Sequence, residues 1–320
     1  MNDPKGWKSE LSGFNHAFAH TWENNNAMHL STGLPTYLYC FTKDTTKIIC
    51  PISERRYKQY TDIFTPYGLS GFAGTGPCPE FNAHWHAFID RKEYVTGFFT
   101  LNPLIDQYDY FPREDIYSYN DLYILGLSQS KEQLFSNLST NRKRQLQHFE
   151  SIKEEICLDK PALIEFFLTN YREFYEIRNA SSLYQLSEES LLFLFNQNNL
   201  FMVGIMKEKS VIAVSVFGYT EYMADFLFNI SLPKGKSYSV ALLWFALLEL
   251  KSTGIPYLNL GGGVKKNDSL ADFKRRFGAD VYPLCALKQI YNKEAYIKLC
   301  VDVNADPDNR IGYFPPYQKP

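Results

Sequence analysis

Two ionisable side chains occupy apolar stretches in the second half of the sequence. Asp225 lies inside the apolar run 222–228, and Lys274 lies between Phe273 and Phe277 in an amphipathic stretch. A carboxylate among apolar residues is costly unless it is paired or faces a cleft, so Asp225 could act as a base or pair with a buried cation. Lys274 could neutralise a phosphate or a developing oxyanion, or it could be a surface lysine on a helical turn.

A polar turn with two cations precedes a helical run of apolar residues. In this turn Lys234 and Lys236 flank Gly235, and Ser237 follows. Free backbone N–H groups at a helix N-terminus favour an anion, so the turn is a candidate contact for a phosphate-bearing donor. An ordinary polar turn is the alternative.

The elements around this turn predict one βαβ crossover. The runs 222–229 and 257–260 are strand-like, and the run 240–250 between them is helical. Such a crossover makes the two strands parallel neighbours. Asn229 and Asn259 end these strands, where α/β sheets bind ligands, so either could contact substrate or cap its strand.

The first half of the chain predicts the same order of elements, namely hairpin, strand, loop, helix and strand. Its Gly-rich loop contains Tyr67, Gly68 and Gly71, which form the candidate acceptor site, with a tight turn and a packed tyrosine as the alternative. The expected elements are strands 36–42, 47–52 and 94–101 with helix 79–91, then helices 163–178 and 188–197 with hairpin 201–206 and 211–219.

Two further segments are expected to be helical. The segment 130–156 carries the basic stretch 140–145, which is either a solvated linker face or a contact to phosphate. The segment 9–26 places His16 and His20 four residues apart. A helix surface is favoured over a metal pair there because the sequence offers no third ligand.

The length of 320 residues predicts two domains. We expect an N-terminal domain with a linker helix over 1–150, a C-terminal domain over 151–305, and an extended tail packed on the surface over 306–320. A hydrophobic fraction of 45% with 21% charged residues is typical of a folded soluble protein. The net charge of −2 argues against DNA binding and leaves room for a local contact to an RNA end.

The six cysteines are scattered without a C-x-x-C motif. This pattern predicts neither a metal cluster nor a disulfide framework, and it favours a reducing cytoplasm. The N-terminus lacks the apolar segment of a signal peptide, and no stretch reaches 18 apolar residues. We therefore expect a cytoplasmic protein without a transmembrane segment.

Several segments of the sequence resemble those of a known family. The strings Leu258-Asn-Leu-Gly-Gly-Gly263 and Ser269-Leu-Ala-Asp-Phe-Lys-Arg-Arg-Phe-Gly278 resemble the C-terminal signature of Fem-type transferases and their acetyltransferase-like relatives. Residues 171–178 with Tyr184, and the segment 141–145, resemble the start of that family's second domain. The loop 65–71 is similar to its first-domain acceptor loop.

The resemblance implies an α+β protein with two tandem GNAT-like domains, each a mixed, mostly antiparallel sheet with flanking helices. It implies transfer of an acyl or aminoacyl group to an amine. It places Lys274 toward the donor. Asp225, on its place in an apolar strand, is the second catalytic candidate, and Asn259, on its place at a strand end, is counted among the donor-binding residues. Tyr184 joins the acceptor side.

Three hypotheses follow. The first is an acyltransferase that uses acyl-CoA, such as acetyl-CoA, and an amine on a cell-envelope-related sugar or peptide precursor, without a metal. The second uses aminoacyl-tRNA as donor. The third is a GNAT pair that binds ligand without catalysis, and the single glycine of the turn 232–239 motivates it. No nucleophile motif such as G-x-S-x-G is present, so direct attack is expected.

Overall fold

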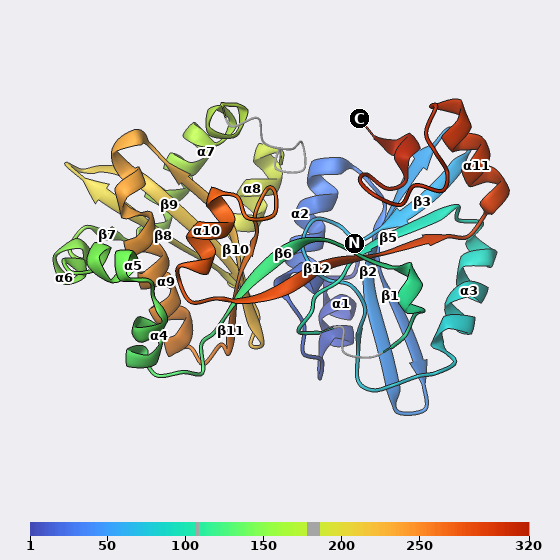
Figure 1. The fold of residues 1–320 in the computed structure, drawn as a ribbon, viewed down its shortest axis with the longest axis horizontal. Coiled ribbons are helices and arrows are strands. Elements are labelled where there is room, and N and C mark those ends of the chain that lie inside the picture. The colour runs from blue at the N-terminus through green and yellow to red at the C-terminus, as the bar shows by residue number, and fades with distance from the viewer. Residues whose placement is uncertain (106–108, 178–185, 320) are drawn as a thin grey trace. The chain divides into compact units, whose positions relative to one another are not determined.

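The computed structural model describes residues 1–105, 109–177 and 186–319. The chain divides into two compact units: unit 1 comprises 1–120 with 283–320, and unit 2 comprises 121–282. Figure 1 shows helices flanking the sheet in each unit. This is the mixed α+β class that the sequence predicts.

Unit 1 contains a sheet in the order β1-β2-β3-β5-β12, with β4 paired to β2. The β3–β5 pair is parallel, whereas β1–β2, β2–β3 and β5–β12 are antiparallel. The elements are α1 Pro4–Leu11, α2 Trp22–Thr32, β1 Thr36–Lys43, β2 Thr46–Tyr57, β3 Tyr60–Phe64, β4 Ala73–Gly74, α3 Phe81–Lys92, β5 Thr96–Thr100 and α11 Lys293–Asp302, with short 3₁₀ turns at Phe18–His20, Arg113–Asp115 and Pro316–Gln318.

Unit 2 contains a sheet in the order β6-β11-β10-β9-β8-β7. The β10–β11 pair is parallel, as the βαβ prediction requires, and the other pairs are antiparallel. Its elements are α4 Lys131–Asn137, α5 Thr140–Gln145, α6 Phe149–Lys153, β7 Ile156–Cys157, α7 Lys160–Glu176, α8 Glu188–Phe195, β8 Leu200–Lys207, β9 Ser210–Tyr219, β10 Met223–Ser231, the 3₁₀ turn η4 Pro233–Tyr238, α9 Ser239–Ser252, β11 Tyr257–Gly262 and α10 Ser269–Arg275.

The same pattern of pairing therefore occurs in both units. A hairpin leads to a third strand, and after a helix a fourth strand pairs with the third in parallel, as β1-β2-β3-β5 and as β8-β9-β10-β11. The repeat of element order that the sequence predicts is present in the sheet topology.

Two strands carry the chain from one unit to the other. β6, Ile116–Gly126, leaves unit 1 and pairs with β11 in unit 2 through residues 122–126. β12, Asp280–Ile290, leaves unit 2 and pairs with β5 in unit 1. The division of the chain thus lies at 120/121 and 282/283, which differs from the boundaries expected at 150/151 and 305/306.

Helices cover both faces of the unit 2 sheet, and successive residues of β8 pack against helices on opposite faces. Val203 and Ile205 on β8 belong to the core beneath α9, a helix that is apolar on all sides. Gly204, which lies between them in sequence, faces the other way, and a Cβ there would lie 2.4 Å from Leu163 of α7. The core of this unit is thus formed on both faces of the sheet.

The helix expected over 130–156 is wrong as one element, since three short helices occupy this segment. The backbone of Leu138 is extended after α4, and the Ser139 side chain accepts from the Arg142 N–H to start α5. The helix expected over 9–26 is likewise divided. The extended Ser12 ends α1, and Thr21 caps α2 by accepting from Asn24 N–H.

The C-terminal segment is anchored in the core of unit 1. Phe314 and Tyr317 are buried with Val95 and Tyr296. The Tyr317 hydroxyl donates to the carboxylate of the buried Asp62 at 2.8 Å. The expected surface tail is therefore attached through buried side chains and includes a 3₁₀ turn at Pro316–Gln318.

Candidate functional site

The parallel pair of unit 2 ends in the middle of both strands. Its register runs from Met223 opposite Tyr257 to Asp225 opposite Asn259, although β10 continues to Ser231 and β11 to Gly262. Beyond that point β10 follows β9 and β11 follows β6, and each strand is bulged, at Leu227 and at Leu260. The two strands thus separate beyond the last pair.

Asp225 and Asn259 form the last pair and are directly linked. The Asn259 Nδ2 donates to Asp225 Oδ1 at 2.8 Å, and both side chains are buried. The Asn259 Oδ1 accepts from the Gly261 N–H at 2.8 Å. The amide of Asn259 therefore joins the carboxylate on β10 to the glycine turn at the end of β11.

Lys274 lies at the other end of this glycine turn. The Asp268 side chain caps α10 by accepting from Ala271 N–H at 2.7 Å, and Lys274 in the last turn is 6% exposed. Its Nζ donates to the Gly262 carbonyl oxygen at 2.5 Å. Gly261 has a φ of +76°, and a Cβ there would lie 3.3 Å from Nζ, so glycine suits both the backbone and the lysine.

Burial controls the charge of Lys274. Removal from water disfavours the ammonium and lowers the lysine pKa to about 8, whereas the negative charge of Asp268 acts in the opposite direction. The side chain is thus largely protonated at pH 7 and largely neutral above pH 9. Such a group can donate to a developing oxyanion or accept a proton, depending on pH.

The two sequence candidates for catalysis are therefore connected. Asp225 binds Asn259, Asn259 binds Gly261, and the carbonyl of the next residue, Gly262, binds Lys274. The residues come from β10, β11 and α10. The fold thus places a buried carboxylate and a buried cation on either side of one glycine turn, with Asn259 bound to the Gly261 N–H and Lys274 bound to the Gly262 carbonyl oxygen.

The predicted donor turn forms η4, between β10 and α9. Lys234, Lys236 and Ser237 are exposed there. Gly235 is buried, and a Cβ on it would lie 2.3 Å from the Ile212 carbonyl oxygen of β9. Packing against the sheet thus accounts for this glycine, without close approach of a ligand.

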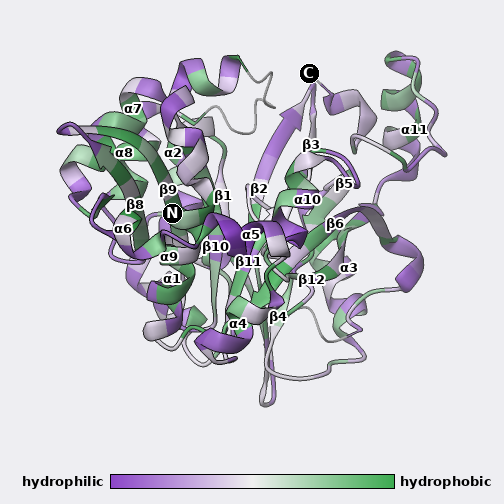
Figure 2. Ribbon diagram, turned by 60° about the vertical axis from the view of Figure 1, so that its left-hand side comes forward, coloured by the Kyte–Doolittle hydropathy of each residue, from purple (hydrophilic) through white to green (hydrophobic). Residues whose placement is uncertain are grey.

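The basic stretch over 140–145 contains a buried cation that sequence reasoning left unassigned. Figure 2 shows that α5 is largely hydrophilic, yet Arg142 on it is 8% exposed. Its guanidinium lies 4.4 Å from the centre of the Phe273 ring and 5.5 Å from that of Phe277. Arg142 therefore packs against two aromatic rings, Phe273 and Phe277, which precede and follow Lys274 in the sequence.

The predicted acceptor loop belongs to unit 1. The Asn24 Nδ2 donates to the Tyr67 carbonyl oxygen at 3.1 Å, and the Thr100 hydroxyl donates to that of Gly68 at 2.7 Å. Gly68 has a φ of +123°, and a Cβ there would lie 2.6 Å from the Cβ of Ala19. Gly71 also has a positive φ. The loop is fixed from both sides, and Tyr184 lies outside the described residues.

His20 lies behind this loop and is fully buried, contrary to the expected helix-surface position. Its Nδ1 accepts from the Ala17 N–H at 3.2 Å, and burial lowers its pKa to about 3. The imidazole is thus neutral at ordinary pH.

Among the described residues, no cluster of three or more His, Cys, Asp or Glu side chains has a geometry suited to a metal ion. Within the same ranges, no helix has the length and apolar character needed to cross a membrane.

Solved structures with a similar fold cover nearly the whole chain. The crystal structure of FemX superimposes with a TM-score of 0.67 at 8% sequence identity, covering 92% of this chain and 98% of that one. This chain has the FemX fold. The likeness confirms the tandem GNAT-like architecture expected from the sequence resemblance, and at this identity it concerns the fold.

Two further structures share the FemX fold with this chain. One is the C-terminal domain assigned to a lysylphosphatidylglycerol synthetase from Agrobacterium fabrum, with a TM-score of 0.59, 11% identity, and coverage of 97% of this chain and 98% of that one. The other is L-PGS from Bacillus licheniformis, with a TM-score of 0.58, 13% identity, and coverage of 96% and 98%. Neither a protein-family model nor a curated protein sequence matches the chain.

Proposed function

We propose that this protein is an acyltransferase that moves an acyl group from acyl-CoA to an amine of a cell-envelope-related sugar or peptide precursor. The placement of Asp225 and Lys274 around one glycine turn, where β10 and β11 separate, carries the proposal. The FemX fold supports group transfer. A second fold neighbour bears the name of a synthetase of lysylphosphatidylglycerol, which supports an envelope-related acceptor.

The proposed reaction is direct attack of the amine on the thioester carbonyl. A carbon–nitrogen bond forms, the carbon–sulfur bond breaks, and the thiol of CoA leaves. The Lys274 ammonium donates to the oxyanion that develops on the carbonyl, and Asp225 accepts the proton that the amine loses. Asp225 then gives this proton to the departing thiolate, so the products are an amide and a thiol and the carboxylate is restored.

The donor is proposed to bind at the carboxyl ends of the parallel strands. Its phosphate groups contact Lys234, Lys236 and Ser237 near the N-terminus of α9, beside the backbone of Gly235. Its acyl arm lies between the separated strands next to Asn259. The proposed acceptor-binding residues are Tyr67, Gly68 and Gly71 of the loop in unit 1, together with Tyr184, which lies outside the described residues.

Aminoacyl-tRNA is the second candidate donor, and the distribution of lysines favours it. Four exposed lysines lie in the two loops that follow β10 and β11, namely Lys234, Lys236, Lys265 and Lys266. Parallel strands end on the same side of a sheet, so both loops leave from that side. A polyanionic donor would use such a surface.

A cytoplasmic location is part of the proposal, because it supplies acyl-CoA and charged tRNA. Its support is the thiol state of all six cysteines, which a reducing compartment maintains.

The test is a transfer assay with the purified chain. Acetyl-CoA and a panel of amino sugars and envelope peptides should release free CoA, detected with a thiol reagent. We expect Lys274→Ala to lower turnover at least about tenfold, because one oxyanion donor is lost. Lys153→Ala, on the exposed face of α6, is the matched control and should leave turnover unchanged.

The other outcomes separate the candidates. Transfer from aminoacyl-tRNA that ribonuclease abolishes would replace acyl-CoA as donor. Thermal stabilisation by a ligand without turnover from either donor would contradict catalysis and favour a binding module. Unchanged kinetics in a folded Lys274→Ala variant would remove this lysine from the site.

A further inference from the structure

Strand β1 forms an open edge of the unit 1 sheet. It is first in the strand order, and within the described ranges β2 is its only strand partner. Thr42 pairs in register with Lys47, which binds Thr75 through both its N–H and its carbonyl oxygen. Thr42 therefore directs its own N–H and C=O away from β2.

In an antiparallel pair, the backbone groups of every second residue point away from the partner strand, so the outward direction found at Thr42 also holds at Cys40 and Leu38. Leu38 pairs with Pro51, which has no N–H to donate, and Cys40 lies between Leu38 and Thr42 with the same parity. All three residues thus present backbone N–H and C=O groups on the open side. Cys40 makes a weak contact from its Sγ to the Leu38 carbonyl oxygen at 3.9 Å, and its side chain also lies beside Glu10 of α1.

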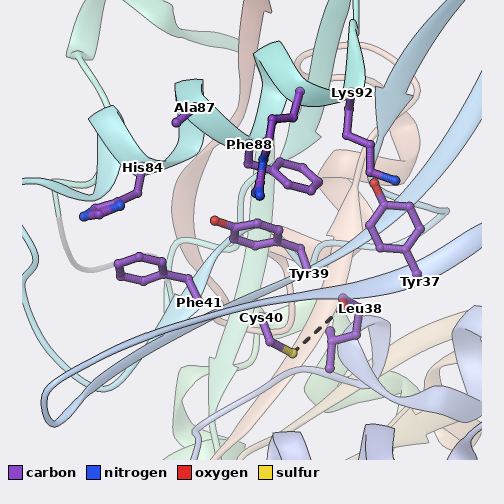
Figure 3. A pocket seen from close by; sticks show the side chains of 10 residues that line it. Tyr37, Leu38, Tyr39, Cys40, Phe41, His84, Ala87, Phe88 and Lys92 are labelled. Carbon is purple, nitrogen blue, oxygen red and sulfur yellow. Dashed lines mark hydrogen bonds between the residues drawn. The ribbon is translucent and has the colours of Figure 1, made fainter.

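A groove of about 800 Å³ lies along the same edge, between β1 and α3. Figure 3 shows Tyr39 and Phe41 on the side of α3, whereas Cys40 points to the other side of the strand. The Tyr39 ring lies 4.8 Å from Phe88, and the Phe41 ring lies 5.0 Å from His84. Aromatic faces thus form the floor of the groove.

The residues that line the groove on the side of α3 carry basic groups and no carboxylate, whereas Glu10 lies beside Cys40 on the other side of the strand (Figure 3). Of its described lining residues, the ionisable nitrogen groups are His84, Arg91 and Lys92, all exposed, and none is Asp or Glu. No ion pair joins Arg91 or Lys92 to a carboxylate in the described ranges of the chain. His84 and Arg91 lie seven positions apart, which is about 10 Å along the helix.

We propose that the β1 edge binds an extended acidic polypeptide segment as an added strand. Backbone groups of Leu38, Cys40 and Thr42 would supply the ladder, and this mode of recognition is general for open sheet edges. Every second side chain of the added strand enters the groove, where acidic groups meet Arg91 and Lys92. None of the residues of this surface belongs to the proposed transferase site.

Charge argues against a second copy of this chain as the occupant. Two copies joined through antiparallel β1 strands would be related by a two-fold axis perpendicular to the sheet. Both α3 helices would then lie on the same face, with Arg91 and Lys92 of one copy near those of the other. Like charges at such a distance oppose the pairing.

The test uses a fluorescein-labelled eight-residue peptide of alternating glutamate and valine, and fluorescence anisotropy with the full chain. We expect saturable binding. The double variant Arg91→Glu/Lys92→Glu should weaken it at least about tenfold, because attraction becomes repulsion. Cys40→Pro removes one outward N–H and should weaken it similarly, while the β1–β2 ladder persists.

The controls separate this site from general charge effects. The matched double variant Lys293→Glu/Lys298→Glu on the exposed face of α11 should bind the peptide as the parent does. A peptide of alternating lysine and valine should not bind the parent. Thermal unfolding verifies that each variant folds.

Several outcomes would overturn the proposal. These are absence of binding up to about 1 mM peptide, equal binding of the lysine peptide, and equal loss with the α11 variant. Sedimentation showing a dimer that Cys40→Pro dissociates would assign the edge to a second copy instead.

Discussion

The Lys274 ammonium donates a 2.5 Å hydrogen bond to the Gly262 carbonyl oxygen, although burial lowers its pKa to about 8. The ordinary lysine pKa is 10.5, so burial of the charge costs about 3 kcal/mol at neutral pH, at 1.36 kcal/mol per unit. The protein retains a destabilising cation beside the glycine turn. A group kept at such a cost is a strong candidate for function.

Replacement of this cation should stabilise the fold. We expect Lys274→Met to raise the free energy of unfolding at pH 7 by about 1–3 kcal/mol, reduced by the lost hydrogen bond to Gly262. The folded pKa lies below the unfolded one, so the parent gains stability between about pH 8 and 10.5, and the advantage of the variant shrinks there. Denaturant unfolding at pH 7 and 9.5 measures both values.

The exposed Lys153→Met is the control and should leave stability within about 0.5 kcal/mol. A Lys274→Met variant that is less stable than the parent at both pH values would show that the hydrogen bond outweighs the burial cost.

Turnover should depend on the charge of the same lysine. If the ammonium donates to the oxyanion, turnover falls as pH rises through about 8, where Lys274 loses its proton. The rising limb at lower pH comes from deprotonation of the acceptor amine. In Lys274→Arg the falling limb should disappear below pH 10, because arginine stays protonated. Parent turnover that keeps rising to pH 10 would contradict this role.

Substitution of Gly235 tests whether packing against β9 or ligand binding requires the single glycine of the donor turn. A Cβ at this position would lie 2.3 Å from the Ile212 carbonyl oxygen, so we expect Gly235→Ala to destabilise unit 2 by about 1–3 kcal/mol. The control is Gly76→Ala, where the nearest atom would be 3.8 Å away. Thermal unfolding compares them. An equally stable Gly235→Ala that loses donor binding would instead assign this glycine to the ligand.

Tyr317 should contribute to the stability of unit 1 through Asp62. The buried Asp62 accepts from Tyr317, Gln318 and Thr96, and burial raises the pKa of its carboxyl group. Tyr317→Phe removes one donor and should cost about 1–2 kcal/mol. The exposed Tyr313→Phe is the matched control, with little expected change. Equal unfolding midpoints for both variants would refute the role of the Asp62 contact.

Local patterns allowed much of each sheet to be predicted. The hairpins β1–β2 and β8–β9 and the parallel pair β10–β11 follow from apolar runs separated by turns and one helix. From the sequence, Asp225 and Lys274 could be predicted only as two separate candidates, without any structural relationship between them. Their connection through Asn259 depends on a register that no local pattern specifies.

Other features depend on contacts distant in sequence. Charge at Arg142 and polarity at His20 suggested exposure, yet rings of Phe273 and Phe277 cover the first and the loop at Gly71 the second. The boundary at 150/151 was expected at the end of a linker helix that separates two halves with the same element order. Here β6 pairs with β11, and β12 with β5.

The exchange of β6 and β12 has a consequence for biosynthesis. Residues 121–282 form unit 2 in a single uninterrupted stretch, whereas unit 1 needs residues from both ends of the chain. During translation Asp62 emerges more than 200 residues before its donor Tyr317, the pair being separated by 255 positions. All residues of unit 2 are therefore synthesised before unit 1 is complete, although synthesis of unit 1 begins earlier.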